Sequence, residues 1–146
     1  MTTPERRIAG LVAIALLMAL VAFSVFADNA KMSVRDAHAR ALSGDIVLVD
    51  IRHRSEWRAT GVATSAVSVS KHEPGFLERI NAVVGGDKSR PVALICAAGV
   101  RSKRMSEALI AEGYKTVIDV SEGMVGGFFG GGWIKAGLPV RAFSVN

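Results

Sequence analysis

Apolar residues follow two different spacings along the chain, and these spacings alternate. Continuous or alternating apolar runs predict strands at residues 46–50, 66–70, 91–96 and 116–120. Apolar residues at helical spacing predict helices at residues 33–43, 54–59, 75–84 and 103–112, with a short one at 133–137. This order predicts an α/β fold with a central, mostly parallel sheet flanked by helices. Ligands of such sheets bind beyond the carboxyl ends of the strands, where Asp50 and Cys96 both lie.

The amino-terminal residues differ in character from the rest of the chain. Residues 8–27 carry no charge and follow Arg6 and Arg7, which is the pattern of an export signal. The stretch is also long enough to span a bilayer, so a signal peptide cleaved near Ala27 and a retained membrane anchor are both open. We therefore expect residues 1–27 to be a signal or anchor. Residues 28–146 are then one domain outside the cytoplasm, periplasmic or otherwise extracytoplasmic.

The net charge of the chain limits the classes of partner that it suits. The net charge is +5, and it becomes +4 without residues 1–27, because Glu5, Arg6 and Arg7 go with them. This mild excess suits a small anionic substrate or an anionic membrane surface. No basic stripe interleaves with aromatic residues, which argues against a nucleic-acid partner.

The chain contains a single cysteine, Cys96, so an internal disulfide is excluded. His38, His53 and His72 are scattered along the sequence and form no cluster with it. We therefore expect structural or solvated histidines, no metal site and no cofactor.

Cys96 ends the apolar run 91–96 and is followed by a short, glycine-bearing loop and a helix. The thiol is therefore expected at the carboxyl end of a strand, beneath a helix amino terminus. Free backbone N–H groups and the positive helix end favour a thiolate there, and the thiolate is the reactive form of cysteine. The alternative is an inert buried thiol, since free cysteine is often a core residue.

Several short motifs together resemble a single rhodanese domain over roughly residues 33–142. They are Leu48–Arg52, Glu56-Trp57, Cys96–Ser102, Glu122-Gly123, Trp133 and Gly137–Val140. The resemblance implies a small α/β domain that transfers sulfur through a persulfide on Cys96. It also implies that five residues form the cradle that binds the donor: Ala97, Ala98, Gly99, Val100 and Arg101. Asp50, Arg52 and Glu56 match the polar framework of the family, and we expect them to join loops through charge-assisted hydrogen bonds.

The residues themselves lead to a similar hypothesis. A nest of N–H groups, a helix amino terminus and Arg101 suit a small dianion such as thiosulfate. With no second cysteine in the chain, the sulfur acceptor is expected to be external, either cyanide or another thiol. The main rival is a cysteine phosphatase, whose CX5R loop is one residue longer than the CX4R loop from Cys96 to Arg101.

A second hypothesis is a sulfur-carrier or protein-binding module with little turnover. Ala97 brings no charge to the loop, and the glycine-rich segment 122–132 also contains the apolar residues Met124, Val125, Phe128 and Phe129. Six of the eleven residues in this segment are glycine. It is predicted either as a flexible loop or as a mobile apolar flap near Cys96.

Overall fold

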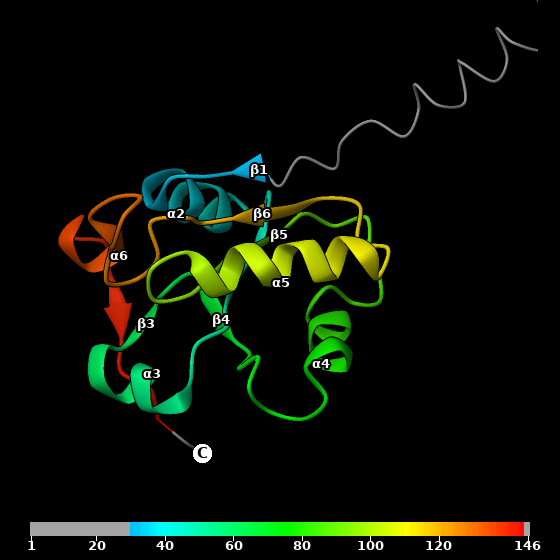
Figure 1. The fold of residues 1–146 in the computed structure, drawn as a ribbon, viewed down its shortest axis with the longest axis horizontal. Coiled ribbons are helices and arrows are strands. Elements are labelled where there is room, and N and C mark those ends of the chain that lie inside the picture. Colours follow the sequence, from blue (N-terminus) through cyan, green and yellow to red (C-terminus); the bar gives the residue numbers. More distant parts are fainter. Residues whose placement is uncertain (1–29, 145–146) are drawn as a thin grey trace, which may run out of the picture.

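The computed structural model describes residues 30–144, and its centre is a five-stranded sheet in the order β1-β6-β5-β2-β4 (Figure 1). The strands are β1 (Ala30–Lys31), β2 (Val47–Asp50), β4 (Ala66–Ser68), β5 (Val92–Ile95) and β6 (Val117–Asp119). Every pairing within this sheet is parallel. The predicted α/β fold with a mostly parallel sheet is therefore confirmed.

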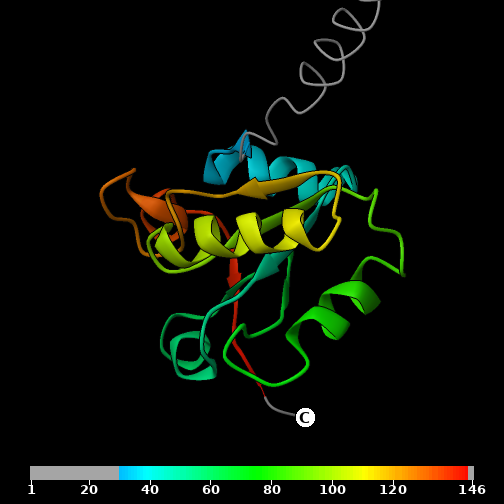
Figure 2. The ribbon, with the colours of Figure 1, turned by 45° about the vertical axis from the view of Figure 1, so that its right-hand side comes forward.

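Helices cover both faces of the sheet, as Figures 1 and 2 show. The helices α2 (Val34–Ser43), α3 (Arg54–Thr60) and α6 (Gly132–Lys135) contribute to one core cluster. The helices α4 (Phe76–Val83) and α5 (Val100–Ala111) contribute to the other. Side chains alternate between these two cores along each strand, so Ile95 faces the first and Cys96 the second.

Helix α5 begins at Val100, so the predicted start at residue 103 is wrong. Gly99 is its N-cap and has a φ of 89°, a left-handed conformation that glycine adopts without a steric penalty. This residue turns the chain directly from strand to helix. Val100 and Arg101 consequently lie in the first turn of α5 rather than in a loop.

Two short strands were not predicted. β3 (Val62–Ala63) and β7 (Val140–Arg141) pair in antiparallel fashion as a separate two-stranded sheet. Two-residue strands are too short to show a periodic pattern, which explains why the sequence did not reveal them. The predicted strand at 66–70 is also shorter than expected, since β4 ends at Ser68.

The predicted signal or anchor at residues 8–27 lies outside the described residues, and so does its cleavage position. Within residues 30–144, no helix is long and apolar enough to cross a membrane.

Candidate active site

Cys96 follows β5 directly and lies beneath the amino terminus of α5, as the sequence predicted. Its side chain is buried, with 1% of the residue exposed. The backbone N–H of Gly99 donates to Cys96 Sγ at 3.2 Å, and that of Ser102 donates at 3.4 Å. The first amides of a helix have no acceptor within the helix, so these two are free to stabilise negative charge on the sulfur.

Ser102 and Asp119 extend the site behind the sulfur. The Ser102 hydroxyl lies 3.4 Å from Cys96 Sγ and 2.6 Å from Asp119 Oδ1, to which it donates. Asp119 ends β6, next to β5, and is 2% exposed. Burial is the largest influence on its carboxyl and raises its pKa, while the hydrogen bond from Ser102 acts in the opposite direction.

Arg101 is held by a carboxylate on a different helix. Its Nη1 and Nη2 donate to Glu56 Oε2 and Oε1 at 2.7 and 2.6 Å, and Glu56 also accepts from the backbone N–H of His53. The hydrogen bonds from Arg101 lower the pKa of Glu56 to about 2. The same pair raises the pKa of Arg101, with a smaller contribution from Cys96. The guanidinium therefore lies within electrostatic reach of the sulfur, but its fork is already occupied.

Two of the three histidines, which are far apart in the sequence, meet beside this ion pair. The rings of His53 and His72 stack with centroids 3.4 Å apart, and His72 Nε2 lies 3.5 Å from Arg101 Nη1. Burial is the main cause that lowers the pKa of His72, and the charge of Arg101 adds to it. His38 is elsewhere, with Nδ1 3.1 Å from the Ser65 hydroxyl.

Asp50 and Arg52 form the framework that the resemblance implied. Both are buried, and Arg52 donates Nε to Asp50 Oδ1 at 3.0 Å and Nη2 to Asp50 Oδ2 at 2.8 Å. Arg52 also donates to the Thr60 hydroxyl and the Gly61 carbonyl at the end of α3. The side-chain alternation in β2 places Asp50 on the face opposite Cys96. This pair therefore joins loops and does not approach the sulfur.

The glycine-rich segment packs directly against the cysteine loop. The N–H groups of Met124 and Val125 donate to the carbonyls of Cys96 and Ala97 at 2.8 and 3.0 Å. A Cβ on Gly123 would lie 2.3 Å from the Ala97 carbonyl oxygen, so this close approach requires glycine. The base of the segment is therefore fixed to the site by main-chain contacts.

The tip of the segment is apolar and exposed. Phe128 is 97% exposed, and Phe129 is about half-exposed. Phe129 lines a hollow of about 380 Å³ with Gly99, Val100, Lys103, Arg104 and Glu107. An apolar surface with basic residues thus adjoins the first turn of α5.

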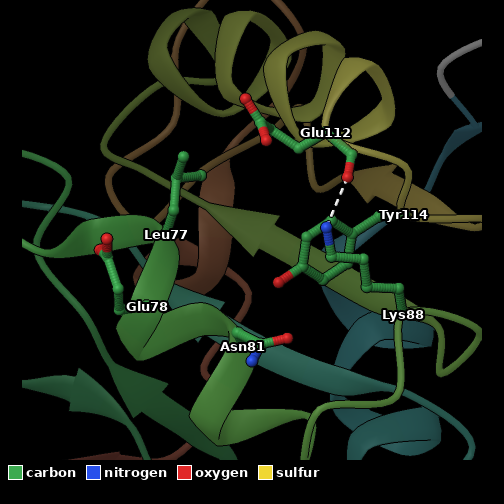
Figure 3. A pocket seen from close by; sticks show the side chains of 6 residues that line it. All are labelled: Leu77, Glu78, Asn81, Lys88, Glu112 and Tyr114. Carbon is green, nitrogen blue, oxygen red and sulfur yellow. Dashed lines mark hydrogen bonds between the residues drawn. The ribbon is translucent and has the colours of Figure 1, made fainter.

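A second hollow lies away from Cys96, between α4 and the carboxyl end of α5 (Figure 3). Its volume is about 350 Å³, and its lining residues are Leu77, Glu78, Asn81, Lys88, Glu112 and Tyr114. Lys88 and Tyr114 precede β5 and β6, so this hollow lies at the amino ends of the strands. It does not belong to the cysteine site. In residues 30–144, no group of histidine, cysteine and acidic side chains is placed to hold a metal ion.

Of the five predicted cradle residues, Gly99 donates a backbone hydrogen bond to the sulfur, and Arg101 lies close by. Ala97 and Ala98 form the turn and contact the glycine-rich segment. Sequence reasoning missed Ser102 as a donor and missed Asp119 altogether. Asp119 could have been found, because a carboxylate ending an apolar strand lies at the same sheet edge as Cys96.

Comparisons with known proteins agree with this fold. The model of the rhodanese-like domain family matches residues 33–127, more than half of the chain. The chain therefore belongs to the rhodanese-like domain family.

Among solved structures, the chain is similar to a polysulfide-sulfur transferase homodimer from Wolinella succinogenes. The two are 28% identical over 87% of this chain and 88% of that one, with a TM-score of 0.61. It is also similar to Rv0390 from M. tuberculosis, at 26% identity over 78% of this chain and 98% of that one, with a TM-score of 0.58. A third similar structure, from Rhodopseudomonas palustris, is a protein of unknown function described as a possible tyrosine phosphatase. It is 26% identical over 77% of this chain and 84% of that one, with a TM-score of 0.53.

Proposed function

We propose that the protein is a sulfurtransferase that carries sulfane sulfur as a persulfide on Cys96. The observation that carries this proposal is the convergence of the Gly99 and Ser102 amides on Cys96 Sγ. Amides aimed at sulfur stabilise a thiolate before attack and the same charge when the sulfur becomes a leaving group. Sulfur transfer needs this stabilisation twice, once in each half of the cycle.

In the first half, the Cys96 thiolate attacks the outer sulfur of the donor. With thiosulfate, a new S–S bond forms to Cys96, the bond between the two donor sulfurs breaks, and sulfite leaves with that electron pair. In the second half, the acceptor attacks the outer sulfur of the persulfide, and Cys96 leaves as a thiolate. Cyanide would become thiocyanate, and a thiolate would become a persulfide.

Polysulfide is a second donor of the same class. Attack on its terminal sulfur transfers one sulfur atom to Cys96 and releases a polysulfide dianion shortened by one atom. The likeness to a polysulfide-sulfur transferase supports this choice. Both donors are small anions, in keeping with the excess positive charge of the chain.

The acceptor in this proposal comes from outside the chain, because Cys96 is the only cysteine. We further propose that the reaction takes place outside the cytoplasm, either in the periplasm or at the membrane. The uncharged residues 8–27 after two arginines support this location.

Phosphatase chemistry fits the site less well. A cysteine phosphatase needs a loop wide enough for a tetrahedral phosphate and an arginine fork that closes over it. Here the loop is CX4R, and both Nη groups of Arg101 donate to Glu56. The arginine thus contributes charge at the edge of the site rather than a free fork.

A carrier or binding module is the second candidate, and the exposed tip of the glycine-rich segment favours it. Phe128 and Phe129 pack edge to face with centroids 5.4 Å apart, and Lys31 lies over the Phe129 ring. Exposed aromatic residues beside a reactive site are typical of a surface that meets another macromolecule. In this function the persulfide forms but passes to a bound partner instead of turning over freely.

The deciding experiment is the intact mass of the full chain after treatment with thiosulfate and, separately, with polysulfide. We expect a gain of one sulfur atom that cyanide removes. The Cys96→Ser variant is the control and should gain none. No gain with either donor would contradict both the sulfurtransferase and the sulfur carrier and would leave a protein-binding module, whereas a gain with slow release to cyanide would favour the carrier.

A further inference from the structure

Asp119 is a buried carboxylate that the sulfur-transfer steps above leave without a role. It is connected to the reactive sulfur by one hydroxyl, since Ser102 Oγ lies 2.6 Å from Asp119 Oδ1 and 3.4 Å from Cys96 Sγ. All three residues are buried, with at most 2% exposed. Bulk water therefore does not separate the thiol from the carboxylate.

We propose that Asp119 is a positioning residue for Cys96 that accepts the thiol proton through the Ser102 hydroxyl. The S–H proton passes to Ser102 Oγ as the Ser102 hydroxyl proton passes to Asp119 Oδ1. The products are a Cys96 thiolate and a neutral Asp119 carboxylic acid, and Ser102 is unchanged. The buried site holds one negative charge before and after the transfer. This inference rests on the proposed function only in treating Cys96 as the nucleophile.

The surroundings of the two acidic groups suit this exchange. The Gly99 and Ser102 amides donate to Cys96 Sγ, so they stabilise the negative charge when it lies on the sulfur. Burial favours the neutral form of Asp119. Two charges in so small a buried volume would repel each other strongly, so the pair should ionise as one coupled unit.

Charged groups from each neighbouring element act on this pair. On the Asp119 side, Lys31 of β1 and Lys103 of α5 favour the carboxylate, while the paired residue on β5 is the apolar Leu94. On the sulfur side, Arg101 of α5 lies within electrostatic reach of Cys96, and Glu56 of α3 neutralises much of its charge. The charges around Asp119 and around Cys96 therefore do not hold the proton on one of the two groups alone, and this is what a transferable proton requires.

A coupled pair has a pH signature that a structural carboxylate lacks. Above the first ionisation, the pair holds one charge, and a constant fraction of molecules carries it on the sulfur. Thiolate reactivity should therefore show a pH-independent plateau, followed by a second rise when the remaining proton leaves. A cysteine that titrates alone loses reactivity about tenfold for each pH unit below its ionisation, with no plateau.

The experiment is the rate of alkylation of the full chain by iodoacetamide, a neutral reagent, from acid to alkaline pH. Thiol alkylation reports on Cys96 alone, because the chain has no other cysteine. In the parent we expect two rises of the alkylation rate with pH, separated by an intermediate plateau. In Asp119→Asn we expect one rise and no intermediate plateau. Ser102→Ala should also lose the plateau, and Ser102→Thr, which keeps a hydroxyl, should restore it. Asp45→Asn, at the opposite end of the sheet, is the matched control and should match the parent.

A parent profile with a single ionisation overturns the proposal, and this result needs no variant to fold. A plateau that persists in Asp119→Asn or in Ser102→Ala overturns it as well. Alkylation requires no sulfur donor, so these outcomes are distinguishable from failure of the mass experiment, which tests sulfur transfer alone.

Discussion

The ion pair between Glu56 and Arg101 gives a quantitative test of how the site is held together. It connects α3 to the first turn of α5 through two hydrogen bonds of 2.6 and 2.7 Å. The pair lowers the pKa of Glu56 from 4.5 to about 2. We predict that Glu56→Gln lowers the free energy of unfolding at neutral pH, and that this difference disappears in acid.

The size of the effect follows from the pKa. A tenfold change in proton affinity is worth about 1.4 kcal/mol, so the lowered pKa sets an upper limit of about 3.5 kcal/mol. The Glu56 side chain is 28% exposed, and solvent screening reduces the contribution to about 1–2 kcal/mol. A carboxylate with a lowered pKa stabilises the fold above its unfolded value near 4.5. The contribution is then lost as the pH falls from there toward 2.

Urea unfolding of the full chain, followed by the fluorescence of the buried Trp57 and Trp133, measures this difference. Detergent belongs in every sample, because residues 8–27 are uncharged and apolar. Glu73 has a pKa of about 2 as well, but it is present in both proteins and cancels in the comparison. Glu78→Gln is the control, since Glu78 forms no ion pair in residues 30–144.

A constant difference between parent and Glu56→Gln across the acid range would refute the electrostatic reasoning. The variant would then act through packing or through the capping of α3, where Glu56 accepts from the backbone N–H of His53. Glu56→Gln also removes the carboxylate that holds the Arg101 guanidinium. The rate at which the variant takes up sulfur therefore reports whether a fixed guanidinium helps donor binding.

Two further substitutions test local features. Gly99→Ala should lower the free energy of unfolding by about 2–4 kcal/mol and slow persulfide formation, because its Cβ would lie 2.1 Å from the Ser121 carbonyl oxygen at a φ of +89°. Gly44→Ala, with a φ of +82° and open space, should cost only about 1 kcal/mol, and equal losses for the two would refute the clash. Tyr114→Phe should leave the free energy of unfolding unchanged or raise it by up to about 1 kcal/mol, because the Tyr114 hydroxyl is buried without a hydrogen-bond partner in residues 30–144. A loss of more than 1 kcal/mol on urea unfolding would mean that this hydroxyl has a partner.

Much of the fold was predictable because its signals are local. Strands buried on both faces leave uninterrupted apolar runs, and this placed β2 and β5 correctly. The position of Cys96 followed from the order of strand, glycine and helix. The start of α5 was misplaced because Val100 and Arg101 carry no cap signal of their own, and the turn depends on a single left-handed glycine.

The contacts of the site were less predictable, because they join residues distant in sequence. Nothing in the sequence pairs Glu56 with Arg101 or stacks His53 on His72. These contacts depend on how α3 and the loop after β4 meet the amino terminus of α5, which is a tertiary property. Asp119 was overlooked for a different reason. The sequence shows an acidic residue at the end of a strand, but it does not show that this strand lies beside the strand that leads to Cys96.

The main-chain contact between the cysteine loop and the glycine-rich segment limits how such a site can diversify. Gly99 meets the carbonyl of Ser121, just before that segment, and Gly123 meets the carbonyl of Ala97, both at distances that exclude a Cβ. Neither glycine can therefore be replaced by a residue with a side chain in order to alter donor preference. Exposed positions such as Val100 and Phe129 are not under this constraint. A library that aims to change the donor or acceptor should randomise those positions and leave both glycines untouched.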